Sequence, residues 1–277
     1  TLEHATWNAV LGYEHPSGRW CTYDTPMSGK RLASAHSIVF QSRPGTPELN
    51  CCSVNGPRGL AMISEWALLG GANGLYLNYY GPGTLEAKLD DGAVWRFDQE
   101  GVFPKEGALK ITVHPGSPKE TALFLRIPAW SQKTRVRVND AGRIAGVSPA
   151  LPEAQPGTYF EISREWKDGD TIAMDFDMSV RALRGDGHVG WKTSLYRGPV
   201  LLTYDQMYND FDPAGIPELD LAALKLEPVA PGVGQWEPIT ALRAAAPDGK
   251  TVTLVDFATA GAHGTRYETW LPVRNAP

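Results

Sequence analysis

Hydrophobic and polar residues alternate with a period of two along most of the chain after Gly71. The alternation is clearest at residues 75–80, 109–114 and 135–139, where the side chains of an extended backbone point to opposite faces in turn. Asp-Gly pairs at positions 91–92 and 168–169 and the segment Asp140-Ala141-Gly142 supply turn signals between such runs. Further strands are expected at 84–89, 93–99, 121–127, 158–164, 171–178, 194–204 and 251–257.

Short strands at regular spacing, with no helical pattern between them, are typical of a β-sandwich. We therefore expect a mainly-β chain in which residues 75–204 form an antiparallel β-sandwich. Residues 239–273 are expected to add strands to it or to a second sheet.

Two segments before Gly71 have a helical period instead. Residues 2–12 place Leu2, Ala5, Ala9 and Val10 on one side, and Gly12 is expected to end this short helix. Residues 57–69 form a second apolar stripe, for which Pro57 suits the first helical position and Gly70-Gly71 the end. Possible strands lie at 19–24 and 37–41 in the irregular connection between them.

Two short helices and a long connection cannot bury their apolar faces alone. We therefore predict that residues 1–70 are the end of a larger helical domain, residues 71–208 a β-sandwich domain, and residues 209–277 a C-terminal β segment or second sandwich. The length of 277 residues is compatible with two domains.

Composition narrows the classes of partner. The formal net charge is −5, and no run of Lys or Arg is longer than two residues, which argues against nucleic-acid binding. No apolar stretch approaches the roughly 18 residues needed to cross a bilayer. We expect a soluble protein, cytoplasmic or periplasmic, without a membrane partner.

The candidate chemistry concentrates at two adjacent cysteines, Cys51 and Cys52, just before the second predicted helix. The positive end of a helix dipole and the nearby Arg58 favour a thiolate, the form of cysteine that attacks electrophiles and binds metals. Small buried thiols or a vicinal disulfide are the alternative interpretation of the pair taken alone. Cys21 is best explained as a plain buried thiol.

The double cysteine also resembles a known active-site motif, that of glycoside hydrolase family 127, the β-L-arabinofuranosidases, and of the related family 146. The motif residues here are Cys51, Cys52, Asn55, Arg58, Leu60 and Ala61. Residues 3–12 are similar to a helix of that family and residues 23–27 to one of its turns. Three downstream segments, at 123–130, 196–202 and 264–272, are similar to landmarks of its β-sandwich domains.

The resemblance implies a catalytic (α/α)6 barrel, of which this chain carries the C-terminal remnant, followed by β-sandwich domains. It further implies that Cys51 is the nucleophile of a retaining double displacement through an S-glycosyl intermediate, with Cys52 beside it as a zinc ligand. Cys51 and Cys52 together are thus the expected metal ligands, and Glu3 and Tyr23 match positions that contact the sugar.

The family's acid/base glutamate and its other zinc ligands would precede Thr1. An oligosaccharide or glycoside would be the substrate, and the chain would be inactive until an N-terminal helical half, as a separate chain or as a precursor, completes it. The alternative is a noncatalytic sandwich module for carbohydrate binding or assembly. Stoichiometric zinc would favour the enzyme.

Overall fold

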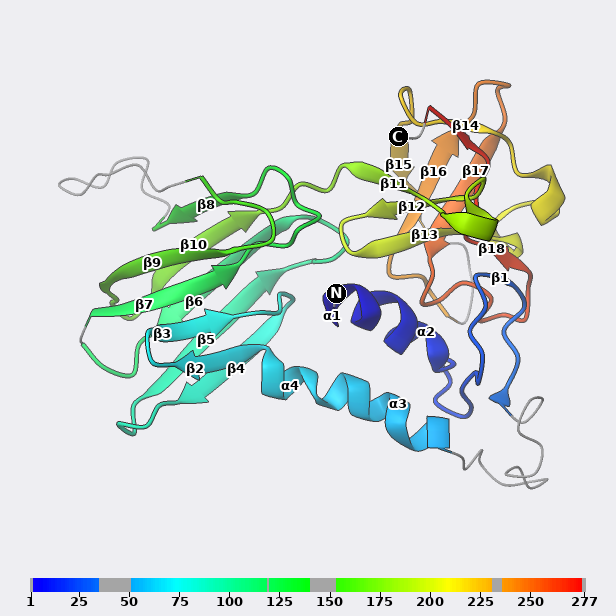
Figure 1. The fold of residues 1–277 in the computed structure, drawn as a ribbon. Helices are drawn as coiled ribbons and strands as arrows, with labels where there is room; N and C mark the ends of the chain where they lie inside the picture. The colour runs from blue at the N-terminus through cyan, green and yellow to red at the C-terminus, as the bar shows by residue number, and fades with distance from the viewer. Residues whose placement is uncertain (1, 35–50, 119, 140–152, 231–235, 276–277) are drawn as a thin grey trace. The chain divides into compact units, whose positions relative to one another are not determined.

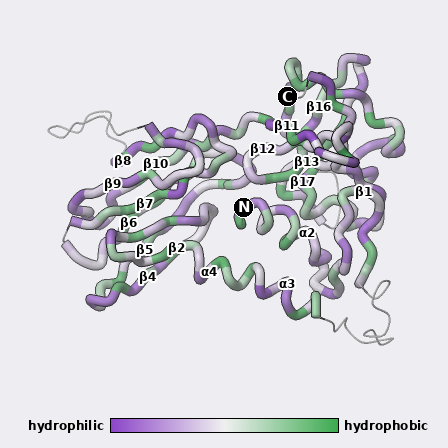
Figure 2. Tube along the Cα trace, in the orientation of Figure 1, coloured by the Kyte–Doolittle hydropathy of each residue, from purple (hydrophilic) through white to green (hydrophobic). Residues whose placement is uncertain are grey.

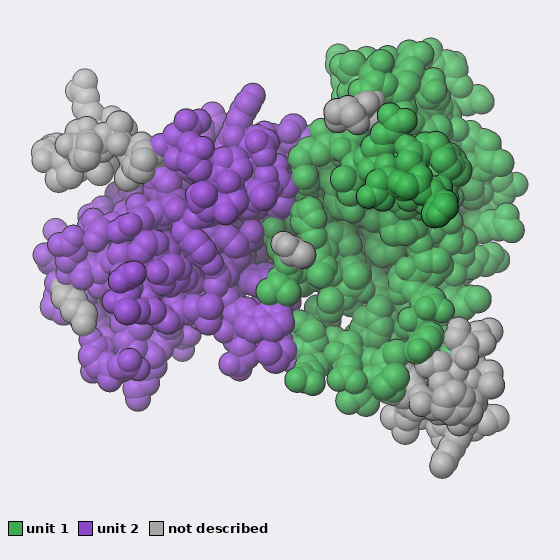
Figure 3. Space-filling view, viewed as in Figure 1, with its two compact units in different colours: residues 1–60, 180–277 green, residues 61–179 purple. Residues whose placement is uncertain are grey.

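The computed structural model describes residues 2–34, 51–118, 120–139, 153–230 and 236–275 (Figure 1). Strands account for 40% of it and helices for 15%, which confirms the predicted mainly-β class. The chain forms two compact units, one of residues 1–60 and 180–277 and the other of residues 61–179 (Figure 3). The predicted domain divisions at 70/71 and 208/209, and the predicted barrel remnant, stay predictions.

The unit of residues 61–179 contains two sheets. One has the strand order β4-β5-β6-β10-β8 and the other β2-β3-β7-β9. Their strands are β2 (Leu68–Gly71), β3 (Gly74–Leu77), β4 (Gly83–Lys88), β5 (Val94–Gly101), β6 (Ala108–His114), β7 (Glu120–Arg126), β8 (Arg135–Val138), β9 (Tyr159–Glu165) and β10 (Asp170–Asp175). Neighbouring strands are antiparallel except β3 and β7, which run parallel with Leu75 opposite Leu123.

The alternating pattern explains this core. In β5, Trp95 and Phe97 are fully buried whereas their neighbours Val94 and Arg96 are exposed. Figure 2 shows the same change of hydropathy from residue to residue along the strands of this unit. A strand turns alternate side chains to opposite faces, so one face of each sheet supplies apolar residues to the core. Arg164 of β9 forms an ion pair with Asp170 of β10 at 3.4 Å, which links the two sheets.

The other unit contains an eight-stranded sheet centred on β13 (Val200–Asp205). Every residue of β13 is buried. β13 pairs with β12 (Thr193–Arg197), β17 (Thr251–Asp256) and β18 (Tyr267–Glu268). The remaining strands of the sheet are β1 (Ser28–Gly29), β11 (Val180–Arg184), β15 (Leu226–Pro228) and β16 (Ala241–Ala245). A separate parallel pair joins β14 (Leu219–Asp220) to β19 (Val273–Arg274).

Four short helical turns also occur in the described chain. They are η4 (Gly187–Val189), η5 (Gln206–Tyr208), η6 (Pro213–Gly215) and α4 (Ile63–Trp66). No described helix is both long and apolar enough to cross a membrane.

The first predicted helix is confirmed as an element, and the residues that it buries are mostly polar. A continuous helical stretch runs through α1 (Leu2–His4), the π-helical segment η1 (Ala5–Val10) and α2 (Leu11–Tyr13). Its buried residues are Glu3, Thr6, Asn8 and Gly12. Leu2, on the predicted apolar side, is 57% exposed, as expected for a helix that this chain cannot cover alone. Asn8 faces this unit's sheet because its side chain bonds the backbone of the β12–β13 hairpin, as described below.

The second predicted helix was placed wrongly. The helix α3 spans Cys51–Ala61, so Pro57 lies inside it rather than at its start. Residues Leu68–Gly71 form strand β2 instead of a helix end, since Leu69 pairs with Tyr76 of β3. The sheet partner thus overrides the local helical pattern there.

Most strand predictions between 75 and 204 are confirmed to within a few residues. The segment predicted as one strand at 194–204 is a hairpin, β12 and β13, because Gly198 adopts a positive φ of 55°. The expected strand at 19–24 is reduced to an isolated bridge between Glu14 and Cys21. The predicted strand at 37–41 and the turn at 140–142 lie outside the described residues.

Candidate active site

The two adjacent cysteines lie in the first turn of α3. Cys51 is exposed and Cys52 half-buried, and both are free thiols. Their sulfur atoms are 3.8 Å apart, so the pair forms no disulfide. The side-chain amide of Asn55, another residue of the motif, donates to the Cys51 carbonyl at 2.8 Å. Cys51 therefore presents its sulfur to solvent at the start of a helix.

Tyr13 holds the start of α3 against the N-terminal helical stretch. Its hydroxyl donates to the Cys52 carbonyl at 3.2 Å. A β-carbon on Gly56 would overlap the Tyr13 ring, so glycine is needed there for this close approach. A second contact of this kind joins Gly59 to Val10, whose Cγ1 would lie 3.1 Å from a β-carbon on Gly59. Glycines one turn apart thus let the two helices meet closely.

The electrostatic surroundings of Cys52 differ from the expectation. Burial, followed by the hydrogen bond from Cys51 and the charges of Cys51, Cys21 and Asp24, raises the pKa of Cys52 to about 11. Arg58, expected to favour a thiolate, lies in the last turn of α3, about 10 Å along the axis from Cys51. Without a cation at the pair, Cys52 therefore stays a thiol at neutral pH.

Glu3 and Tyr23, the predicted sugar-contacting residues, lie on different elements. Glu3 is 5% exposed on the buried side of α1, and Tyr23 is 50% exposed in the turn before β1. Asp24, next to Tyr23, is close enough to Cys52 to affect its pKa, which places this turn near the cysteines. Cys21 is 2% exposed, which agrees with the buried thiol expected there, and its sulfur lies 4.0 Å from the Ser34 hydroxyl.

A buried arginine fixes the segment that carries this turn. Arg31 is 5% exposed, and its guanidinium donates to the carbonyls of Gly12, Phe257 and Ala260. It also lies over the rings of Phe257 and Tyr267, at 5.0 and 5.3 Å from their centroids. Burial lowers the pKa of Arg31, whereas the nearby acidic groups oppose that effect. No local signal in the sequence pointed to this residue, since two of its three partners lie more than 200 positions away.

Asn8 attaches the helical stretch to the hairpin of β12 and β13. Its amide nitrogen donates to the carbonyls of Pro199 (2.8 Å) and His4 (2.8 Å), and its amide oxygen accepts from the Leu201 N–H (2.8 Å). Asn8 and residues 196–202 belong to two separate segments of the family resemblance, and the structure brings them into contact. The turn of residues 23–27 likewise meets residues 264–272, because Tyr267 donates to the Pro26 carbonyl at 2.6 Å.

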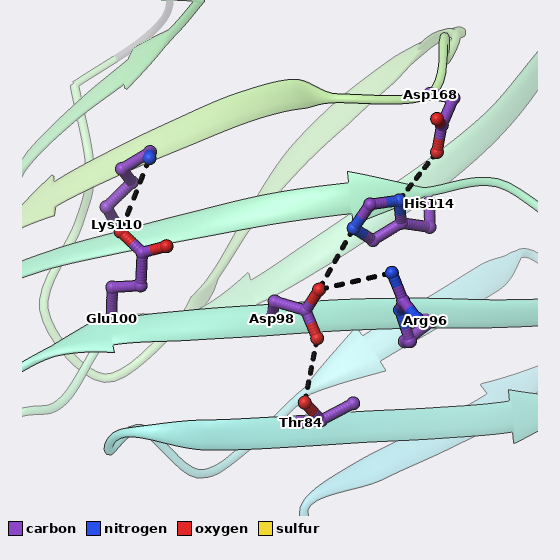
Figure 4. Close-up of polar contacts among 7 residues, drawn as sticks. All are labelled: Thr84, Arg96, Asp98, Glu100, Lys110, His114 and Asp168. Carbon is purple, nitrogen blue, oxygen red and sulfur yellow. Dashed lines mark hydrogen bonds and ion pairs between the residues drawn. The ribbon is translucent and has the colours of Figure 1, made fainter.

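A second polar cluster lies on the five-stranded sheet of the other unit (Figure 4). His114 sits between two carboxylates, with Nδ1 2.6 Å from Asp168 and Nε2 3.0 Å from Asp98. The Thr84 hydroxyl donates to Asp98 at 2.7 Å, and Arg96 lies 3.3 Å from the same carboxylate. The Thr84 hydrogen bond, then Arg96 and His114, hold the pKa of Asp98 below its usual value. Each ring nitrogen of His114 is occupied by a different carboxylate, so the cluster is a cross-strand connection.

The described residues contain no group of three or more His, Cys, Asp or Glu side chains placed to hold a metal ion. Cys51 and Cys52 nevertheless fit two positions of a tetrahedral zinc site. Zinc–sulfur bonds of about 2.3 Å at a tetrahedral angle separate two sulfurs by about 3.8 Å. The observed separation is 3.8 Å.

Comparison with known proteins supports one family. Residues 74–178 match the model of the middle domain of GH127 β-L-arabinofuranosidases. A solved structure described as a glycoside hydrolase superposes with a TM-score of 0.77 at 24% identity, covering 99% of this chain and 48% of its own. A search of curated proteins found no match.

Two solved GH127 enzymes are also similar. A β-L-arabinofuranosidase from Geobacillus stearothermophilus T6 has a TM-score of 0.73 at 22% identity, and a β-arabinofuranosidase has 0.73 at 20%. Each alignment covers 98% of this chain and 45% of the relative. The chain thus spans about half the length of the structures it matches. The predicted resemblance is confirmed: residues 74–178 match the GH127 middle domain, and the chain shares the fold of solved GH127 glycoside hydrolases along nearly its whole length.

Proposed function

We propose that the chain is the C-terminal part of a retaining glycoside hydrolase that acts on β-L-arabinofuranosides, with Cys51 as its nucleophile. The observation that carries this proposal is the exposed Cys51 thiol in the first turn of α3, next to Cys52, in a chain with the GH127 fold. Solvent access and the helix N-terminus both suit a thiolate nucleophile.

The reaction has two displacements. In the first, the Cys51 thiolate attacks the anomeric carbon, the glycosidic C–O bond breaks, and a general acid protonates the departing oxygen. In the second, the conjugate base takes a proton from water, the water oxygen bonds to the anomeric carbon, and the C–S bond breaks to regenerate the thiolate. Two inversions give net retention. The acid/base group is proposed to lie in the rest of the enzyme.

Cys51 and Cys52 are the side chains that would hold zinc, as their sulfur separation allows. A bound zinc ion keeps thiols deprotonated at neutral pH and moderates their reactivity. Two protein ligands are fewer than the three or four usual for zinc, so further ligands are proposed to come from the helical half.

Glu3 and Tyr23 are proposed to contact the sugar. Tyr23 exposes half of its surface in the turn whose neighbour Asp24 affects Cys52, so its ring is accessible near the thiols. Glu3 belongs to the helical stretch that ends at Tyr13, the residue bonded to the Cys52 carbonyl. A carboxylate and a phenol both bond sugar hydroxyls.

The functional form is proposed to include an N-terminal helical half, as a separate chain or in a precursor. Two observations support this. None of the eleven residues of α3 is buried, and the apolar side of residues 2–12 is uncovered, with Leu2 57% exposed. Helices in globular proteins gain most of their stability from packing an apolar side, so both helices need a cover.

The test is an assay on a chromogenic β-L-arabinofuranoside with the chain joined to its helical half. Cys51→Ala should reduce turnover by at least about a hundredfold while thermal unfolding stays unchanged. Ser53→Ala, in the same helical turn, is the matched control and should keep full activity. Turnover by Cys51→Ala above about a hundredth of that of the unmodified enzyme would show that another group is the nucleophile.

Metal content tests the zinc proposal separately. One zinc per molecule is expected in the complete enzyme, and Cys52→Ala should lower that occupancy. A noncatalytic carbohydrate-binding or assembly role is the alternative, favoured by the presence of only two candidate ligands together in the described residues. An intact complete protein without zinc or turnover would support that alternative.

A further inference from the structure

A polar pocket opens beside the eight-stranded sheet, on the unit of residues 1–60 and 180–277. Its volume is about 530 Å³, within the range of roughly 300–1,000 Å³ of small-molecule sites. The loop after β13 forms one side, with Tyr208 and Phe211, and the outward side chains of β16 and β17 form the floor, with Arg243 and Thr253. Neither cysteine of the candidate active site takes part.

The loop that forms this pocket is held rigidly. The side chain of Asn209 bonds the backbone of Thr253 in β17 as a neighbouring strand would. Its amide oxygen accepts from the Thr253 N–H at 2.9 Å, and its amide nitrogen donates to the Thr253 carbonyl at 3.0 Å. Asp205 accepts from the Met207 N–H, and Gln206 donates to Asp212 at 2.8 Å. A site that is ordered before binding loses less entropy when a ligand arrives.

Two charged side chains in the pocket have hydrogen-bonding capacity to spare. Within the described residues, Arg243 of β16 and Asp210 of the loop form no side-chain hydrogen bond or ion pair, and both are exposed. One supplies only donors and the other only acceptors when ionised. The half-buried Tyr208 and Phe211 add apolar surface to the pocket lining.

We propose that this pocket binds a neutral sugar ring. Adjacent sugar hydroxyls both donate and accept, so one ring can bond the Arg243 guanidinium and the Asp210 carboxylate together while its apolar face rests on an aromatic side chain. An anionic ligand would meet the Asp210 charge, and a cation would meet Arg243. The site gives the chain a sugar contact that is independent of the Cys51 chemistry.

The test is a titration of the isotopically labelled 277-residue chain with L-arabinose, D-xylose, D-galactose and D-galacturonate, followed by NMR of the backbone amides. A neutral sugar should shift the amides of Asn209, Arg243 and Thr253. Arg243→Gln and Asp210→Asn should each weaken that binding about tenfold or more, the loss expected for one hydrogen bond to a charged group. Arg137→Gln, an exposed arginine of β8, is the matched control and should bind normally.

Three results would overturn the proposal. They are the absence of shifts at these amides with every neutral sugar up to its solubility limit, equal binding by the Arg243 and Asp210 variants, and tighter binding of galacturonate than of the neutral sugars. Each variant is checked by its amide spectrum, so loss of folding is distinguished from loss of binding. Cys51→Ala should bind like the unmodified chain, which separates this test from that of the proposed hydrolase activity.

Discussion

The aromatic ring of Tyr13 occupies the space that a β-carbon on Gly56 would need. This contact fixes the first turn of α3, and with it the cysteine pair, against the N-terminal helical stretch. A glycine inside a helix normally costs about 1 kcal/mol relative to alanine, so this position departs from local preference for the sake of the contact.

Gly56→Ala is therefore expected to lower stability although alanine is the better helix former. Overpacking typically costs about 1–3 kcal/mol, which exceeds or offsets the gain of about 1 kcal/mol in helix propensity. Thermal unfolding measures the change. Val54→Ala, at a 68% exposed position of the same helix, is the control and should be neutral or slightly stabilising. A more stable Gly56→Ala protein would show that Tyr13 does not pack there.

Cys52 is expected to react slowly with iodoacetamide at neutral pH when no metal is present. Its pKa is raised to about 11, first by burial and then by the hydrogen bond from Cys51. The alkylation rate, followed by mass spectrometry of the peptide, should keep rising with pH up to about that value. Cys51→Ala removes the hydrogen bond and one neighbouring charge, so the rise should move to lower pH. The alkylation rate stops rising once the pH exceeds the pKa of the thiol. A rate that is already constant at pH 8 would mean that the pKa of Cys52 lies below the value of about 8.5 for a free thiol, which would contradict the expectation.

The cross-strand cluster of Figure 4 predicts a response to acid. The pKa of Asp98 is lowered in the folded state from the ordinary 3.8, mainly by the Thr84 hydroxyl. A carboxyl with a lowered folded pKa stabilises the fold above pH 3.8, and this contribution is lost as the pH falls through the lowered value.

Thr84→Val should move the Asp98 pKa back toward 3.8, as measured by NMR of its carboxyl carbon, and should reduce the stability that acid removes. Thr84→Ser keeps the hydroxyl and should titrate like the unmodified chain. An unchanged Asp98 pKa in Thr84→Val would assign the shift to Arg96 and His114 instead.

Arg31→Met should destabilise the unit of residues 1–60 and 180–277 by about 3 kcal/mol or more. The variant leaves three buried carbonyls without their donor, at about 1–3 kcal/mol each. Unfolding in urea gives the change. The exposed Arg19→Met is the control, with an effect within about 0.5 kcal/mol. A small loss for Arg31→Met would mean that water replaces the guanidinium.

The sequence predicted the strands of the 61–179 unit well because their signal is local. Trp95 and Phe97 alternate with polar neighbours, so the period alone identifies β5 and its buried face. The strand β16 lies within residues 239–273, which were predicted to add strands, but it was not located individually. Its sequence Ala-Leu-Arg-Ala-Ala has the composition of a helix and becomes a strand through its pairing with β17.

The candidate site was predicted only in part, because only part of its signal is local in the sequence. The Cys51-Cys52 motif is contiguous and could be identified directly, whereas the contacts that hold it are distant in sequence. Tyr13 meets Cys52 across 39 positions and Arg31 meets Ala260 across 229. Gly56 is a local signal for the Tyr13 contact only once α3 is known to span Cys51–Ala61, because a helix interior seldom uses glycine without a packing reason. The predicted helix began at Pro57, which placed Gly56 before it.

The discontinuity of one unit has a consequence for synthesis. Residues 61–179 are complete as soon as they leave the ribosome, whereas residues 1–60 must await residues 180–277. Until Phe257 and Ala260 emerge, the Arg31 guanidinium has no carbonyls to bond at that end of the chain. The middle of the polypeptide can therefore fold first, and the segment that carries Cys51 and Cys52 reaches its final place only after residues 180–277 have been synthesised.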